Sequence, residues 1–245
     1  MRIEVLHLPA QAVPSTRRSP LVFVHGSYHG AWCWRENFMP YFASAGYDCW
    51  AISLRGQGGS ERGDLKISGS IKSLSDDLAS FIATLPSPPV LIGHSFGGIV
   101  VERYLLDIPK GNPPLAGVAC LASVPPTGNY DIVKRTIKRS LVDAWKITWY
   151  QKQLASCSPV RMIDLAALRK DVPLPPLPAA LSTLPAYVGC GDTDIIVDLP
   201  ATEELAAWFG VQPVVWQEVA HDCMLDTRWE EVAASLQQFL EGIER

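Results

Sequence analysis

Short apolar runs that alternate with segments of helical spacing are the feature that most constrains the fold of this chain. Most of the runs are apolar throughout, which is typical of strands covered by helices on both faces of a sheet. Such an alternation predicts crossover helices around a mostly parallel β-sheet, and therefore an α/β fold. The expected strands lie at 21–24, 49–52, 90–92, 118–121, 186–188 and 214–216.

The segments between these runs carry apolar residues at helical steps. In the clearest case, apolar residues recur every three or four positions from Trp229 to Leu240. The segment around Asp76 is expected to end as a helix before Pro86. Helices are therefore expected near 34–45, 71–85, 97–107, 200–209 and 227–242.

Residues 124 to about 183 break the alternation, because they are too many for a simple crossover between two strands. Apolar residues recur every four positions from Val133 to Trp149, and this stripe predicts a helix over about 131–154. A proline-rich stretch then returns the chain to the sheet. We expect a small helical lid at about 124–183, inserted into a single domain that spans 1–245.

Composition is typical of a globular protein and argues against two classes of partner. Apolar residues make up 48% of the chain and charged residues 19%, so the chain is expected to fold around a core. The net charge of −4 argues against a nucleic-acid-binding protein, which normally carries a basic face. No stretch approaches the roughly 18–20 apolar residues of a membrane helix, so no stable membrane insertion is expected.

The first eight residues alternate like a strand and lack the features of a signal peptide. We therefore expect a cytoplasmic protein, or an organellar one if a transit peptide has been removed. The six cysteines form no CxxC pair and have no zinc-type spacing. We expect reduced thiols and no metal site.

The segment Gly93-His94-Ser95-Phe96-Gly97 follows one expected strand and precedes an expected helix. Its G-x-S-x-G pattern in this strand–turn–helix context is typical of a nucleophile elbow. The serine of an elbow sits on a sharp turn, and only small neighbours let the strand and the helix pack that closely. We predict that Ser95 is a nucleophile whose hydroxyl lies above one edge of the sheet.

A serine hydroxyl needs a base to take its proton, and that base needs a carboxylate to orient it. His221 follows the expected strand at 214–216 and is the best candidate for the base. The carboxylate should follow an intermediate strand, so that the chain order is serine, aspartate, histidine. We favour Asp194, which has the Gly-x-x-Asp spacing, with Asp192 as the alternative and Asp198 as a weaker one.

The oxyanion that forms in such a reaction needs two N–H donors. One donor should be the amide of Phe96, the residue after the nucleophile. The second should come from the loop that follows the strand at 21–24. There we favour the amide of Ser27, with Tyr28 as the alternative, and expect His25 to brace the loop.

Several aromatic and imidazole side chains near these residues are candidates for substrate binding. They are His29 and Trp32 beside the oxyanion loop, His94 next to the nucleophile, and Trp145 and Trp149 in the expected lid. Each of them has an equally simple role in packing, and that alternative stays open. A lipophilic substrate is favoured by the aromatic residues of the lid and of the oxyanion loop, which are Trp145, Trp149, Tyr150, Trp32, Trp34 and Phe38.

With these motifs in hand, the chain resembles the α/β-hydrolase superfamily over essentially its full length. The resemblance rests on His25-Gly26, the motif at 55–60, the elbow, the Gly-x-x-Asp loop and the late His221. Residues 29–34 are similar to the oxyanion loop of plant methylesterases and hydroxynitrile lyases, and residues 221–226 to the histidine loop of lysophospholipase-like members. One departure is Ser53, which stands where the family usually carries an aspartate.

The resemblance implies the α/β-hydrolase fold, with the lid inserted after the sixth strand. It also implies a serine carboxylesterase or lipase that works through an acyl-enzyme, without a metal ion or an organic cofactor. The partner would be a small-molecule ester. The basic face at 134–139 either touches an anionic lipid surface peripherally or is simply solvated, and the sequence carries no signal for an oligomeric state.

Three alternative functions use the same scaffold. A hydroxynitrile lyase usually has a lysine near the aspartate loop and a threonine after the oxyanion-loop histidine. Here no lysine lies between 171 and 245, and Gly26 follows His25. A carbon–carbon bond hydrolase, or a ligand receptor without turnover, would keep the same three side chains.

Overall fold

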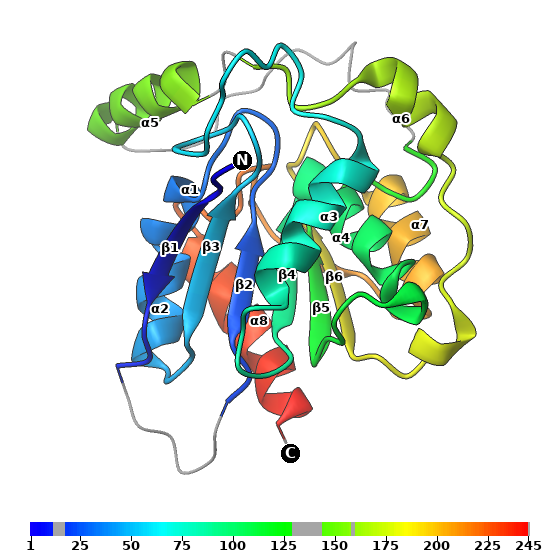
Figure 1. Cartoon of the computed structure of the whole chain (residues 1–245). Coiled ribbons are helices and arrows are strands. Elements are labelled where there is room, and N and C mark those ends of the chain that lie inside the picture. Colours follow the sequence, from blue (N-terminus) through cyan, green and yellow to red (C-terminus); the bar gives the residue numbers. More distant parts are fainter. Residues whose placement is uncertain (12–17, 129–143, 158–159, 245) are drawn as a thin grey trace.

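The computed structural model describes residues 1–11, 18–128, 144–157 and 160–244, and a twisted β-sheet lies at its centre (Figure 1). Among these residues, one seven-stranded sheet has the strand order β1-β3-β2-β4-β5-β6-β7. β1 is antiparallel to β3, and every other neighbouring pair is parallel, which confirms the mostly parallel sheet expected from the apolar runs. The strands are β1 (Glu4–Leu8), β2 (Leu21–Val24), β3 (Cys49–Ser53), β4 (Val90–His94), β5 (Gly117–Leu121), β6 (Ala186–Gly191) and β7 (Val214–Trp216).

Helices cover both faces of the sheet, as the apolar strands require (Figure 1). One face is covered by α1 (Trp32–Arg35), α2 (Phe38–Ser44) and α8 (Trp229–Ile243). The other is covered by α3 (Ile71–Ile82), α4 (Phe96–Leu105) and α7 (Leu199–Phe209). Two short 3₁₀ turns, η1 (Ile108–Lys110) and η3 (Ala179–Leu181), lie in connections.

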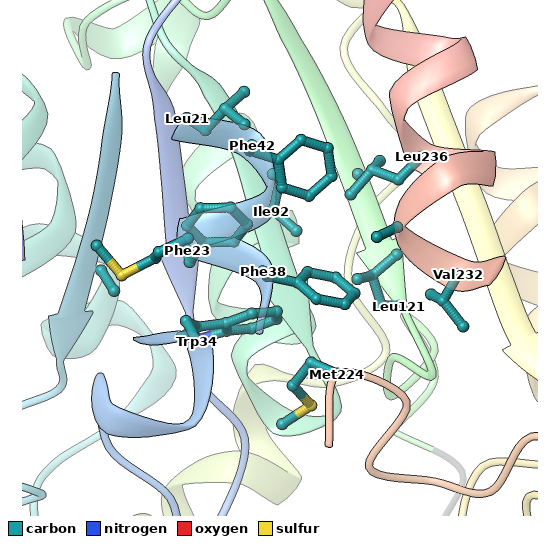
Figure 2. Packing of buried hydrophobic residues seen from close by; sticks show 14 of the residues in the cluster. Leu21, Phe23, Trp34, Phe38, Phe42, Ile92, Leu121, Met224, Val232 and Leu236 are labelled. Atoms are coloured by element: carbon teal, nitrogen blue, oxygen red, sulfur yellow. The ribbon is translucent and has the colours of Figure 1, made fainter. Parts of the chain in front are cut away.

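Figure 2 shows the core on the first face. The ring of Phe23, on β2, packs against Trp34, Phe38 and Phe42 from the segment that holds α1 and α2. Each large apolar side chain that is fully buried contributes about 1.5–3 kcal/mol to folding. This core therefore anchors α1, and with it the loop between β2 and α1, against the sheet.

Two further helices, α5 (Ala144–Cys157) and α6 (Leu165–Asp171), lie over the carboxyl ends of the strands (Figure 1). Both belong to the stretch between β5 and β6. The helix expected over 131–154 is described from Ala144 onward, while its part at 129–143, with the basic face at 134–139, lies outside the described residues. α6 was not expected, although it has a local signal: Asp164 caps it by accepting the N–H of Ala166 at 2.8 Å.

Two expectations differ from the structure in detail. The stretch that holds α5 and α6 follows the fifth described strand and not the sixth, because the described residues before β2 contain one strand, β1. The helix expected near 34–45 is split into α1 and α2, with Asn37 at a non-helical φ of −131°. Pro40 causes the break, because it has no N–H for the carbonyl of Glu36 and its ring crowds that carbonyl.

None of the helices in the described part of the chain is long and apolar enough to cross a membrane. The five cysteines whose side chains are described are buried and form no disulfide with one another. They are Cys33, Cys49, Cys120, Cys190 and Cys223.

Candidate active site

Ser95 occupies the sharp turn between β4 and α4, at φ 51° and ψ −122°. Such a positive φ is strained for a residue with a side chain, so the packing around it must hold it there. A Cβ on Gly97 would lie 2.5 Å from the carbonyl oxygen of His25, and one on Gly98 would lie 1.6 Å from the Oγ of Ser123. The glycines therefore let α4 approach β2 and β5 closely enough to force the turn.

The side chains of Ser95, His221 and Asp194 form one hydrogen-bonded chain. The Nε2 of His221 lies 2.9 Å from the Oγ of Ser95, and its Nδ1 lies 2.8 Å from the Oδ2 of Asp194. The three residues follow β4, β7 and β6, so the carboxyl edge of the sheet brings together residues up to 126 positions apart. A carboxylate accepts only, so Nδ1 carries the proton and Nε2 is left to accept the serine proton.

The carboxylate of Asp194 is held in place by backbone donors. Its Oδ1 accepts the N–H groups of Ile196 at 2.8 Å and Val197 at 3.0 Å, which leaves Oδ2 for the imidazole. Asp192, the alternative, accepts the N–H of Glu218 at 2.6 Å. Asp198, the weaker candidate, caps α7 by accepting the N–H of Ala201. The structure thus places Asp194 on the imidazole and the other two carboxylates on backbone amides.

The loop between β2 and α1 lies directly against Ser95. A Cβ on Gly26 would be only 2.8 Å from the Cβ of Ser95, so a larger residue does not fit there. Ser27 and Tyr28 follow, the latter at a strained φ of 66°. The amide of Phe96 is the first of α4, where helix N–H groups have no intrahelical acceptor. The expected oxyanion donors, Phe96 with Ser27 or Tyr28, therefore lie on the two backbone segments that flank Ser95.

His25 braces this loop, as expected. Its Nδ1 donates to the carbonyl of Gly26 at 2.7 Å, and its Nε2 accepts the N–H of Leu54 at 2.9 Å. Burial lowers the pKa of His25 to about 4, so the ring is neutral at neutral pH and can accept at Nε2. Ser53, the residue that departs from the family pattern, accepts the N–H of Ala31 at 2.8 Å and so ties the start of α1 to β3.

His94 is fully buried, and its ring centroid lies 4.9 Å from that of His221. Its Nε2 donates to the carbonyl of His221 at 2.9 Å, and burial, followed by the neighbouring imidazole of His221, lowers the pKa of His94 to about 3. His29 is almost as buried, and its ring stacks on Trp32 at a centroid distance of 5.6 Å. Both histidines were expected to line the substrate site, and the structure gives both of them packing partners beside it.

The tryptophans expected to bind substrate divide into two groups. Trp32 is buried, and its ring meets Trp149 of α5 edge-on at 5.4 Å and Tyr150 at 6.0 Å. These contacts join α1 to α5 next to His29. Trp145 also belongs to α5, but its side chain lies outside the described residues.

Nitrogen and oxygen atoms of His94, His221 and Asp222 lie within 4.8 Å of one another, a spacing that raises the question of a metal ion. The Nε2 of His94 carries a proton, because it donates to a carbonyl, and both ring nitrogens of His221 are engaged by Ser95 and Asp194. A metal ion binds a ring nitrogen only where that nitrogen carries no proton and its lone pair is free. Three of the four ring nitrogens in this cluster, the Nε2 of His94 and both nitrogens of His221, are therefore already engaged in hydrogen bonds.

Two acidic residues near the site have no counterpart among the sequence-based candidates. Asp222, next to His221, lies 3.6 Å from the Nε2 of His29 and 3.9 Å from the Nε2 of His94. Glu102 is fully buried on α4, with its Oε1 3.3 Å from the Oγ of Ser123. Glu102 had a local signal, since it is a charged residue within an apolar helical stretch. Asp222 had no such signal, because its partners His29, on the loop after β2, and His94, at the end of β4, come close to it only in the folded structure.

Comparisons with known proteins identify the family of the chain. A family model described as the alpha/beta hydrolase family matches residues 21–235. Methylesterase 1 of Arabidopsis thaliana is 34% identical over 96 residues, which cover 38% of this chain and 36% of that protein. The chain thus matches about a third of the length of this curated relative.

Solved structures share the fold at low identity. Methylesterase MES16 from Arabidopsis superposes with a TM-score of 0.68 and 22% identity, over 91% of this chain and 99% of that one. A bromoperoxidase from Bacillus anthracis superposes with a TM-score of 0.72 and 19% identity, over 98% of this chain and 95% of that one. Since the two are named for different reactions, these likenesses show the fold, and the side chains at the site must carry the argument about chemistry.

Proposed function

Because the chain belongs to the alpha/beta hydrolase family, we propose that it is a serine hydrolase that cleaves carboxylic esters. The observation that carries this proposal is the hydrogen-bonded chain from the Oγ of Ser95 through His221 to Asp194, at 2.9 and 2.8 Å. The local similarity to a methylesterase supports an ester as the substrate class.

The proposed reaction uses these groups in two halves. His221 takes the proton of Ser95 at Nε2 while the Oγ forms a bond to the ester carbonyl carbon. The carbonyl oxygen becomes an oxyanion, held by the amide of Phe96 and by an amide of Ser27 or Tyr28. The carbon–oxygen bond to the alcohol then breaks as His221 returns its proton to the leaving alcohol, which leaves an acyl group on Ser95.

Water completes the cycle by the same route. His221 takes a proton from water, whose oxygen attacks the acyl carbon, and the proton passes to the Oγ of Ser95 as the acid leaves. Asp194 stays ionised throughout and holds the Nδ1 proton, which keeps the tautomer that the reaction needs. The two halves together convert an ester and water into an acid and an alcohol.

The stretch between β5 and β6 supports a lipophilic substrate. α5 and α6 lie over the edge of the sheet where Ser95 sits, and the rings of Trp149 and Tyr150 approach Trp32. We propose that this stretch acts as a lid within one domain. An apolar acyl or alkyl chain would then be desolvated between the lid and α1.

The test combines activity with a covalent probe. The wild-type protein should hydrolyse p-nitrophenyl acetate and take up one fluorophosphonate per chain at Ser95. Ser95→Ala should remove the labelling and lower kcat by at least about 10³-fold, as is typical for loss of a nucleophile. A Ser95→Ala protein that keeps the wild-type rate would overturn the proposal.

A matched pair of aspartate variants tests the third residue. Asp194→Asn should lower kcat about 10⁴-fold, because an amide stabilises the wrong imidazole tautomer. Asp192→Asn is the control, since it changes a carboxylate two residues away that contacts the backbone of Glu218. If Asp192→Asn lost more activity than Asp194→Asn, the assignment of the acid would be wrong.

A further inference from the structure

A second aspartate–histidine pair lies beside the proposed triad, formed by Asp222 and His29. We propose that this pair is a positioning device: it ties the loop between β2 and α1 to the loop that carries His221, and so holds the peptide between Ser27 and Tyr28 in the orientation that an oxyanion requires. The inference rests on the proposed hydrolase function and adds two residues to its machinery.

The contact joins two loops that are far apart in the chain. The Oδ2 of Asp222 lies 3.6 Å from the Nε2 of His29, a separation typical of an ion pair. His29 is only 5% exposed, and its Nε2 has no hydrogen-bond partner among the described atoms. A buried imidazole nitrogen without a partner is costly, so the carboxylate facing it is its natural counter-charge.

The other nitrogen of His29 acts on the loop itself. Its Nδ1 donates to the carbonyl of Ser27 at 2.8 Å. In a planar trans peptide the C=O of one residue and the N–H of the next point in opposite directions. Fixing the Ser27 carbonyl therefore also fixes the direction of the Tyr28 N–H.

That peptide needs such a restraint. Tyr28 has a strained φ of 66°, and the residue is 69% exposed, so its own packing does little to hold it. Gly26, one residue before Ser27, lies against the Cβ of Ser95. A small rotation of the peptide would therefore move a candidate oxyanion donor relative to the nucleophile.

The charges around His29 favour the pair. The ionisable groups that face it are Asp222 from the His221 loop, His94 at the end of β4, and His25 from its own loop. Burial lowers the pKa of both His94 and His25, to about 3 and about 4, so neither competes as a cation at neutral pH.

The charge of Asp222 decides the state of His29. Burial alone would lower the pKa of His29, but the charge of Asp222 and the Ser27 carbonyl outweigh it, so the pKa is raised above 6.5. Partial burial likewise opposes ionisation of Asp222, whose side chain is 38% exposed, but the His29 charge prevails and lowers the pKa of that carboxyl. The ion pair is therefore complete between the lowered pKa of Asp222 and the raised pKa of His29, and it is lost as the pH rises through the pKa of His29.

The key variant is Asp222→Asn, which keeps the shape of the side chain and removes its charge. We expect kcat for p-nitrophenyl acetate to fall about tenfold with KM within about twofold, a smaller loss than the roughly 10²–10³-fold for an oxyanion donor itself. Affinity for a trifluoromethyl ketone, which forms an oxyanion on Ser95, should fall by a similar factor. The alkaline limb of the pH–rate profile should move to lower pH, since His29 loses the charge that keeps it protonated.

Asp226→Asn is the matched control. Asp226 lies on the same loop and also holds it, through the N–H of Ala220 at 3.0 Å, but it does not face His29. Its replacement should lower the Tm without moving the alkaline limb. A shift of that limb in Asp226→Asn equal to that in Asp222→Asn would overturn the inference.

Two variants of His29, to Asn and to Gln, distinguish the roles of its two ring nitrogens. They also test the inference if the Asp222→Asn protein does not fold. Asn presents its amide near the position of Nδ1 and keeps the contact with Ser27, whereas Gln presents it near Nε2 and keeps the contact with Asp222. Both should lose the alkaline limb, and His29→Asn should retain more of the ketone affinity than His29→Gln. Equal ketone affinity in both, at the wild-type level, would contradict the role of the Ser27 contact.

Failure of the inference differs from failure of the proposed function. If the wild-type protein neither hydrolyses the ester nor takes up fluorophosphonate, the hydrolase proposal is wrong and the pair has no reaction to serve. If the wild type does both, while Asp222→Asn keeps its kcat, ketone affinity and pH profile, only the positioning role is wrong.

Discussion

Glu102 is a carboxyl group that lies fully inside the protein, on the helix that begins at the nucleophile elbow. Ser123 is its hydrogen-bonding neighbour, and the Oε2 of Glu102 has no partner among the described atoms. Burial raises the pKa of Glu102 well above 4.5, because an ionised carboxylate loses its hydration there. This residue therefore makes a pH-dependent contribution to stability close to Ser95.

The sign of that contribution follows from the raised pKa. A carboxyl group whose pKa is higher in the folded state stabilises the fold fully below its unfolded pKa and loses this stabilisation as the pH rises toward the folded pKa. A difference of one pH unit between the two pKa values is equivalent to about 1.4 kcal/mol of stability. Glu102→Gln, which does not titrate, should therefore gain Tm relative to the wild type as the pH is raised from about 5 to 8.

Differential scanning fluorimetry across this pH range measures the effect. Glu203→Gln, on the exposed part of α7, is the control and should show no such trend. A constant Tm difference between Glu102→Gln and the wild type at all pH values would show that the buried carboxyl does not titrate in this range.

Among the elements, the contact between α4 and the end of β5 determines the geometry of the elbow. The Cα of Gly98 faces Ser123, and the carbonyl of Ser95 accepts the N–H groups of Gly98 at 3.0 Å and Val124 at 3.2 Å. The helix start and the loop after β5 thus hold the same carbonyl. The glycine pattern predicted a tight turn, but only the structure shows which neighbour requires each glycine.

A double-mutant cycle tests this contact. Gly98→Ala should destabilise the protein by about 1–3 kcal/mol, since the new Cβ meets both side-chain atoms of Ser123. Ser123→Gly removes those atoms, and the next neighbour of the Cβ, the Cα of residue 123, lies at 3.4 Å. In urea unfolding, the double variant should therefore recover most of the free energy of unfolding that Gly98→Ala loses. Additive losses would mean that another contact sets how closely α4 approaches β5.

For the molecule as a whole, the main division is between the sheet with its two helical layers and the stretch over its carboxyl edge. The two cores bind the layers to the sheet, and Trp149 and Tyr150 are the aromatic contacts that join α5 to α1. We propose that the half-buried ring of Trp149 at this boundary contributes to substrate binding.

Trp149→Ala tests that expectation. The KM for p-nitrophenyl octanoate should rise about fivefold to tenfold, equivalent to about 1–1.4 kcal/mol of lost apolar contact, while the KM for the acetate stays within about twofold. Trp208→Ala, on α7, is the control and should change neither constant. Equal effects of Trp149→Ala on both esters would indicate that α5 does not contact the acyl chain.

Much of this protein was predictable from the sequence because the relevant physics is local. Apolar runs indicate burial on both faces of a strand, and the glycines around Ser95 indicate a tight turn. Pro40 is a local signal too, for the helix break that the prediction over 34–45 missed. Each of these depends on neighbours a few residues away. The family fold and the candidates Ser95 and His221 follow from such signals.

Tertiary structure alone decided which of these groups meet. Asp194 and Asp192 are two residues apart with similar spacing to a glycine, and the backbone donors around β6 and β7 direct one carboxylate to the imidazole and the other to the N–H of Glu218. Asp222 and His29 are 193 positions apart and lie close together because β7 and β2, which precede them, end at the same edge of the sheet. Distance along the chain carries no information about such contacts, since they form only when the sheet fixes where its loops converge.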